Sequence, residues 1–87
     1  MDNVPVQLLL FGLARELACA SVKAIEVPHI IDRKELTRII FDELCRELID
    51  IREVCILSLN GEYIFNDEPF VVDPNSEIAV IPPISGG

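Results

Sequence analysis

The 87-residue sequence is poor in the side chains that most often carry acid–base, metal or nucleic-acid chemistry. It has one histidine, no tryptophan and seven Lys and Arg residues against 15 Asp and Glu. The resulting net charge of −8 argues against binding to the phosphate backbone of nucleic acid. From Glu53 onward there are six acidic residues and no Lys or Arg. Such a stretch either keeps the protein soluble or attracts a basic partner, and both interpretations stay open.

The three cysteines do not form a recognisable metal or disulfide pattern. Cys19, Cys45 and Cys55 are odd in number, and with His29 as the single histidine they lack the spacing of a zinc site. Cys45 and Cys55 stand among apolar residues, where a free cysteine acts as a small hydrophobic side chain. His29 has no nucleophile beside it in the sequence and is interpreted as a loop residue. We therefore expect no metal site.

Long apolar runs are also missing. No segment approaches the ~20 apolar residues of a membrane-spanning helix, and the first basic residue, Arg15, comes too late for a secretion signal. We expect a cytosolic protein without membrane contact. The length allows one domain, predicted to comprise residues 1–81.

Alternating apolar residues predict five strands, at residues 4–11, 22–27, 54–59, 62–65 and 78–81. In the first strand Val6, Leu8 and Leu10 share one face, while Gln7, Leu9 and Phe11 share the other. In the second strand Lys23 and Glu26 mark the solvent side, and residues 14–21 are interpreted as a long connection between the two strands. Asn60-Gly61 predicts a hairpin, because both residues accept positive φ.

One amphipathic helix is predicted to begin at Asp32, which with Glu35 has the spacing of a capping box. Its apolar stripe is Leu36, Ile39, Ile40, Leu44 and Leu48, and its outer face has possible ion pairs of Asp42 with Arg38 and with Arg46. The stripe needs a sheet to cover it. The order of elements therefore predicts an α+β domain of the β-grasp kind, with a mixed sheet packed on one main helix.

The last six residues, 82–87, are predicted to form an extended, flexible tail. Pro82-Pro83 ends the last strand and keeps the chain extended. Gly86-Gly87 has no Cβ atoms, so it is thin enough to enter a narrow channel with its terminal carboxylate first. A carboxylate is inert at neutral pH, but adenylation makes its carbonyl carbon a target for a sulfur nucleophile. A frayed chain end is the simpler alternative.

Several segments resemble the family of molybdopterin synthase small subunits, which are ubiquitin-like sulfur carriers. They are LFGLAREL (10–17), the helix from Asp32, LNG (59–61) and EIAVIPPISGG (77–87). The last is the most specific, because the family typically ends in an apolar residue, Pro-Pro, two variable residues and Gly-Gly. Members of that family often have an aromatic residue directly before Pro-Pro, whereas this chain has Ile81. The residue at this position is apolar in both cases.

The resemblance implies a subunit that donates sulfur without being the catalyst. An E1-like adenylyltransferase/sulfurtransferase would use ATP to convert Gly87 to a glycyl adenylate and then to a thiocarboxylate, 1-thioglycine. The resemblance also implies a heterotetramer of two small and two large subunits, with the active site mainly on the large subunit and no permanently bound cofactor. The tail would enter that site and give its sulfur to cyclic pyranopterin monophosphate in molybdenum cofactor synthesis. The inserted residues would be Pro82, Pro83, Ile84, Ser85 and Gly86.

The sequence also predicts a docking surface. If Gln7 and Glu77 face solvent, then Leu9, Phe11 and Ile81 lie on the side away from the helix, and Tyr63 extends this patch. Apolar residues gathered on an acidic protein indicate a partner, whereas scattered apolar residues or a thin second core would not.

Three other functions remain open at this point. One is a sulfur carrier for thiamine synthesis or tRNA thiolation, and another is a ubiquitin-like modifier joined to lysines through Gly87. The third is a plain binding module with a disordered tail.

Overall fold

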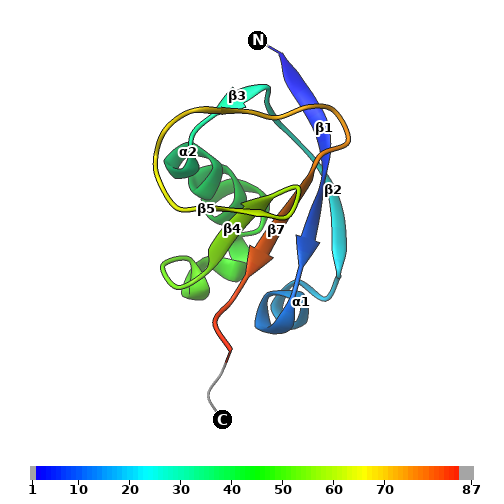
Figure 1. The fold of residues 1–87 in the computed structure, drawn as a ribbon. Helices are drawn as coiled ribbons and strands as arrows, with labels where there is room; N and C mark the ends of the chain where they lie inside the picture. The colour runs from blue at the N-terminus through cyan, green and yellow to red at the C-terminus, as the bar shows by residue number, and fades with distance from the viewer. Residues whose placement is uncertain (1, 85–87) are drawn as a thin grey trace.

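The structure, a computed structural model, describes residues 2–84 and consists of a mixed sheet with one main helical segment on one face (Figure 1). The sheet has the order β2-β1-β7-β4-β5, with β1 and β7 parallel and the other pairs antiparallel. Its strands are β1 (Asn3–Leu10), β2 (Val22–Pro28), β4 (Ile56–Leu59), β5 (Glu62–Ile64) and β7 (Glu77–Ile81). The predicted α+β class and β-grasp arrangement are confirmed.

Two shorter features complete the fold. Strands β3 (Ile30–Ile31) and β6 (Phe70–Val71) form a separate two-stranded sheet. Helix α1 (Gly12–Ala18) overlaps residues 14–21, which were predicted only as a long connection between the first two strands, so the helix itself was not predicted. With seven residues, α1 is too short to show helical periodicity. It is held by tertiary contact, because Ala14 is fully buried and α1 packs against η2 (Arg46–Ile51) and β7.

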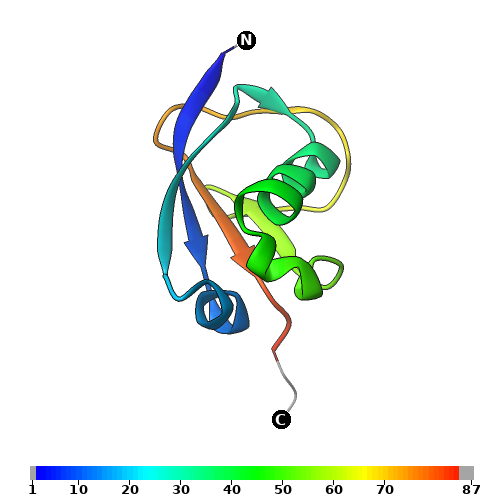
Figure 2. The ribbon, with the colours of Figure 1, turned by 180° about the vertical axis from the view of Figure 1, so that it is seen from behind.

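The main helical segment crosses one face of the sheet, as Figure 2 shows. It begins as α2 (Arg33–Thr37), continues as the π-helical η1 (Arg38–Leu44) and ends in the 3-10 helix η2. Asp32 caps it as predicted, because its side chain accepts a hydrogen bond of 2.8 Å from the backbone N–H of Glu35. Glu35 does not complete the capping box with a hydrogen bond back to the Asp32 backbone N–H, because its carboxylate binds Arg38 instead.

The π-helical turn changes which residues of this segment enter the core. The backbone N–H of Cys45 donates to the Ile40 carbonyl at 2.7 Å, five residues back. The wider turn rotates the following residues, so Leu44, predicted to be buried, is 44% exposed. Phe41 and Cys45 are buried in its place, beside the correctly predicted Leu36, Ile39, Ile40 and Leu48.

The same turn explains why the predicted ion pairs of Asp42 are wrong. Arg38 binds Glu35 and, five residues on, Glu43, whereas Asp42 accepts a hydrogen bond of 3.0 Å from Arg52.

In the second strand, the prediction that Lys23 lies on the solvent side is also wrong. Lys23 faces the helical side and binds Glu47 at 2.9 Å, while Glu26 is exposed as predicted.

Candidate functional site

Strand β1 separates the two faces of the sheet by strict alternation. Val6, Leu8 and Leu10 are buried against the helical segment, whereas Gln7 is exposed and Leu9 is half-buried. The predicted alternation is confirmed. We call the side opposite the helical segment the outer face of the sheet.

Strand pairing brings distant residues together on the outer face. Leu9 pairs with Ala79, Ala79 with Ser58 and Ser58 with Tyr63, which makes one row across β1, β7, β4 and β5. Nearer the tail, Ile81 pairs with Ile56, and Phe11 follows directly on β1. The four residues predicted to bind a partner, Leu9, Phe11, Tyr63 and Ile81, therefore border one groove of about 230 Å³. Their role in binding stays a prediction.

The Asn60-Gly61 turn anchors one end of this groove. Asn60 and Gly61 have φ values of 51° and 87°, as the hairpin prediction required. The backbone N–H of Asn60 donates to the Glu77 carbonyl at 2.7 Å, and its side-chain oxygen accepts from the Glu77 N–H at 2.8 Å. The turn thereby fixes the start of β7, the strand that leads to the tail.

Aromatic side chains border the outer face on the β5 side. Tyr63 and Phe65 pack edge to face with ring centroids 5.7 Å apart, and both are more than half exposed. Phe65 was not assigned to the predicted docking surface, although extending the alternation of β5 past Ile64 would have placed it beside Tyr63.

The tail leaves the fold beside a second, larger apolar groove of about 790 Å³. The residues lining it come from α1 and the residue before it, from η2 and the following turn, and from the end of β7 and the chain after it. They are Phe11, Gly12, Leu13, Glu16, Ile51, Val54, Ile81, Pro82, Pro83 and Ile84. Pro82 is half-buried and Ile84 is almost fully exposed, so the chain turns outward here. The predicted residues Ser85, Gly86 and Gly87 lie outside the described part of the chain.

Gly12, the first residue of α1, lies close to the tail and has a backbone conformation that favours glycine. Its φ of +52° is strained for any residue with a side chain, and an added Cβ would lie 3.8 Å from Cγ of Pro82. The sequence alone did not show this contact, because Gly12 and Pro82 are 70 positions apart (82 − 12).

The positions of the three cysteines and His29 do not favour a catalytic or metal-binding role. Cys19 is exposed, Cys45 is buried and Cys55 is half-buried. Burial raises the pKa of both the Cys45 and Cys55 thiols, so neither readily forms the nucleophilic thiolate. The Nδ1 atom of His29 lies 2.8 Å from the Val72 carbonyl, between β2 and β3. Within residues 2–84 there is no cluster of three or more His, Cys, Asp or Glu side chains arranged to hold a metal ion.

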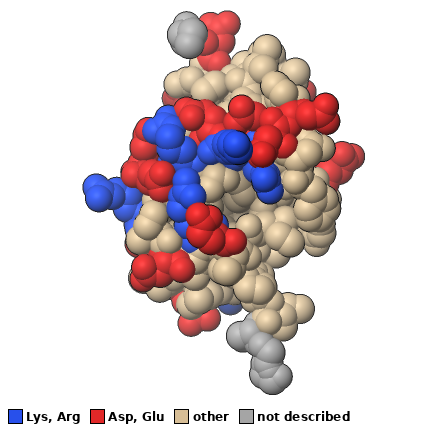
Figure 3. All heavy atoms as spheres, turned by 90° about the vertical axis from the view of Figure 1, so that its left-hand side faces the viewer, with Lys and Arg blue, Asp and Glu red and all other residues tan. Residues whose placement is uncertain are grey.

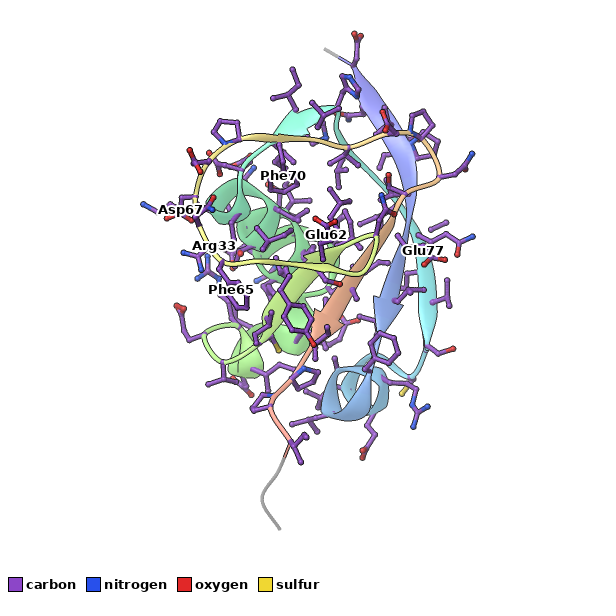
Figure 4. The ribbon with its side chains drawn as sticks, in the orientation of Figure 1. Arg33, Glu62, Phe65, Asp67, Phe70 and Glu77 are labelled. Carbon is purple, nitrogen blue, oxygen red and sulfur yellow. The ribbon has the colours of Figure 1, made fainter. Side chains whose placement is uncertain are left out.

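Basic residues gather on the side that bears α2, intermixed with acidic ones (Figure 3). Figure 4 shows Arg33 of α2 beside Asp67 of the loop after β5, and their side chains are 2.8 Å apart. Arg33, together with Arg38 and Arg52, borders a charged groove of about 710 Å³. This groove was not predicted, because the residues that form it are distant in sequence.

None of the described helices is long and apolar enough to cross a membrane.

Comparison with known proteins identifies the family. The model of the ThiS family matches residues 8–87. The molybdopterin synthase sulfur carrier subunit of Caenorhabditis briggsae is 38% identical over 84 residues, covering 97% of this chain and 99% of that protein.

Two solved structures have a similar fold. A complex of subunits 1 and 2 of the molybdopterin-converting factor from Helicobacter pylori contains a chain that is 25% identical, with a TM-score of 0.67 and coverage of 97% and 100%. The small archaeal modifier protein 1 of Methanosarcina acetivorans superposes with a TM-score of 0.72 over the full length of both chains at 18% identity, which speaks for the fold alone. The chain therefore belongs to the ThiS family, within its group of molybdopterin synthase sulfur carrier subunits.

Proposed function

We propose that the chain carries sulfur on Gly87 and delivers it to the large subunit of molybdopterin synthase by inserting residues 82–87 as a flexible tail. Residues 1–81 then act as the folded body that docks. The observation that carries this proposal is the continuity of the outer face with the tail. Ile81 borders the groove and is followed directly by Pro82-Pro83.

Docking through Leu9, Phe11, Tyr63 and Ile81 would fix the point from which the tail starts. Six extended residues span at most about 20 Å. The acceptor site on the large subunit must therefore lie within that distance of the docked Ile81. The prolines limit the conformations of the free tail and so reduce the entropy lost when it enters a channel.

The chemistry on Gly87 needs two partners. We infer that an E1-like enzyme transfers AMP from ATP to the terminal carboxylate with release of pyrophosphate, and that sulfur supplied at the sulfide level displaces the AMP and leaves the thiocarboxylate. The large subunit then receives this sulfur for cyclic pyranopterin monophosphate. Two small and two large subunits would form the complete synthase. The H. pylori complex of subunits 1 and 2 supports such a partnership, and we place all these steps in the cytosol.

Reconstitution with the activating enzyme, ATP, a sulfur source and the large subunit tests this proposal. Deleting Gly87, or adding one residue after it, should abolish molybdopterin formation and leave urea unfolding unchanged, because the tail lies beyond the sheet. The matched control adds one residue before Met1 and should retain activity. Normal activity without Gly87 would refute the proposal, and covalent conjugates between Gly87 and lysines of other proteins would favour a modifier instead.

A further inference from the structure

The outer-face groove has a shape suited to a single side chain. Its floor is formed by the small residues Ala79 and Ser58, whose exposed fractions are 7% and 4%. Leu9 and Tyr63 flank this floor in the same row of the sheet. The volume of about 230 Å³ is below the range of pockets that enclose small-molecule ligands, which begins at about 300 Å³.

One end of the groove is negatively charged. Glu77 is the single charged residue among those that line it, and no Lys or Arg is among them. In the described part of the chain no Lys or Arg nitrogen lies within ion-pairing distance of the Glu77 carboxylate. Figure 4 shows Glu77 on the side of β1 and β7, across the molecule from Arg33.

Backbone hydrogen bonds hold Glu77 in this position. Its N–H and its carbonyl both bind Asn60, so the residue is fixed while its carboxylate stays exposed. An exposed carboxylate at the end of an apolar groove fits an occupant with an apolar stem and a cationic head. Lysine and arginine side chains have this composition.

We propose that the groove receives one arginine side chain from the large subunit. Its methylene groups lie along Leu9 and Ala79, and its guanidinium binds the Glu77 carboxylate at the end of the groove. Arginine fits better than lysine, because a planar guanidinium pairs with a carboxylate through two parallel hydrogen bonds, whereas an ammonium group is a point charge without this geometry. Such anchors in pockets often dominate an interface. This inference rests on the proposed function, since it names a contact of that partner.

A double-mutant cycle tests the proposal on the full-length chain and the large subunit of the same organism. The dissociation constant is measured by titration calorimetry at physiological salt for the parent chain, for Glu77→Gln and for Glu26→Gln. Glu26→Gln removes the same charge from the outer face of β2, outside the groove. Exposed arginines and lysines of the large subunit are replaced by alanine one at a time and combined with each variant.

Glu77→Gln should weaken binding about tenfold, and its effect should vanish when one particular arginine of the partner has been removed. Glu26→Gln should change the dissociation constant less than about twofold and be additive with every partner variant. Equal effects of the two substitutions, additivity of Glu77→Gln with every arginine, or coupling to a lysine would each overturn the arginine assignment and leave the proposed function intact. Absence of binding by the parent chain would instead overturn the proposed function.

Discussion

Leu8 and Leu9 are chemically identical neighbours on opposite faces of the sheet, and replacing each by alanine separates folding from docking. Leu8 is fully buried among residues of β2, β7 and the helical segment, whereas Leu9 is half-buried beside the outer-face groove. Leu8→Ala removes buried methyl groups and leaves a cavity, which costs about 2–5 kcal/mol. For a total stability of about 5–15 kcal/mol this is a large loss. Leu9→Ala should cost less than about 1 kcal/mol, because solvent already reaches the side chain.

Urea unfolding and binding to the large subunit measure the two effects. With a denaturant slope of about 1–3 kcal/mol/M, Leu8→Ala should lower the unfolding midpoint by roughly 1 M or more, with little change for Leu9→Ala. Binding should show the reverse order. Leu9→Ala should weaken it by about 1–3 kcal/mol, and Leu8→Ala should weaken it little at a temperature where the variant is fully folded.

Equal destabilisation by the two substitutions would refute the assignment of faces. Parent-like binding by Leu9→Ala would refute the docking role of the outer face even if the stabilities differ as expected.

Three further predictions follow from single contacts. Asn60→Ala should destabilise the fold by about 1–3 kcal/mol in urea unfolding, since it loses the bond to Glu77 and must keep a φ of 51°; Asn60→Gly, which accepts that φ, should cost less. The hydrogen bond from Lys23 lowers the pKa of Glu47 below 4.5, so Glu47→Gln should lower the free energy of unfolding above that pH. This loss should disappear as the pH falls through the lowered folded-state value, which unfolding at a series of pH values will show, and a loss that persists in acid would contradict the ion-pair explanation. Cys19→Ser should leave stability unchanged, whereas Cys45→Ser should cost about 1–3 kcal/mol by burying a hydroxyl; loss of sulfur transfer in a folded cysteine-free variant would contradict the role of Gly87.

Local patterns were sufficient to predict the sheet and its two faces. The alternation of residues 4–11 is strict, and Asn60-Gly61 has one favoured conformation, so both predictions held. The four residues of the docking surface were grouped by the same alternation. The pairing of the first and last strands, which brings Leu9 beside Ala79, is shown by the structure.

Features that depend on tertiary contact were missed. Helix α1 is stabilised by packing on η2 and β7, and a seven-residue segment has no periodic pattern of its own. The exposed position of Leu44 follows from one hydrogen bond between Cys45 and Ile40, since a pattern of apolar residues does not distinguish an α-helical turn from a π-helical one. The small floor of the outer-face groove depends on Ser58 and Ala79 becoming neighbours, which only the strand register shows.

Intact-mass spectrometry of the protein isolated from its native cell tests the central claim most directly, because it reads the state of the C-terminus. A fraction of the protein should be heavier by the mass difference between sulfur and oxygen, and fragmentation should place the sulfur on Gly87. The added mass should disappear in cells that lack the activating enzyme. Sulfur found on Cys19, Cys45 or Cys55, with an unmodified carboxylate on Gly87 in cells that contain that enzyme, would contradict the account.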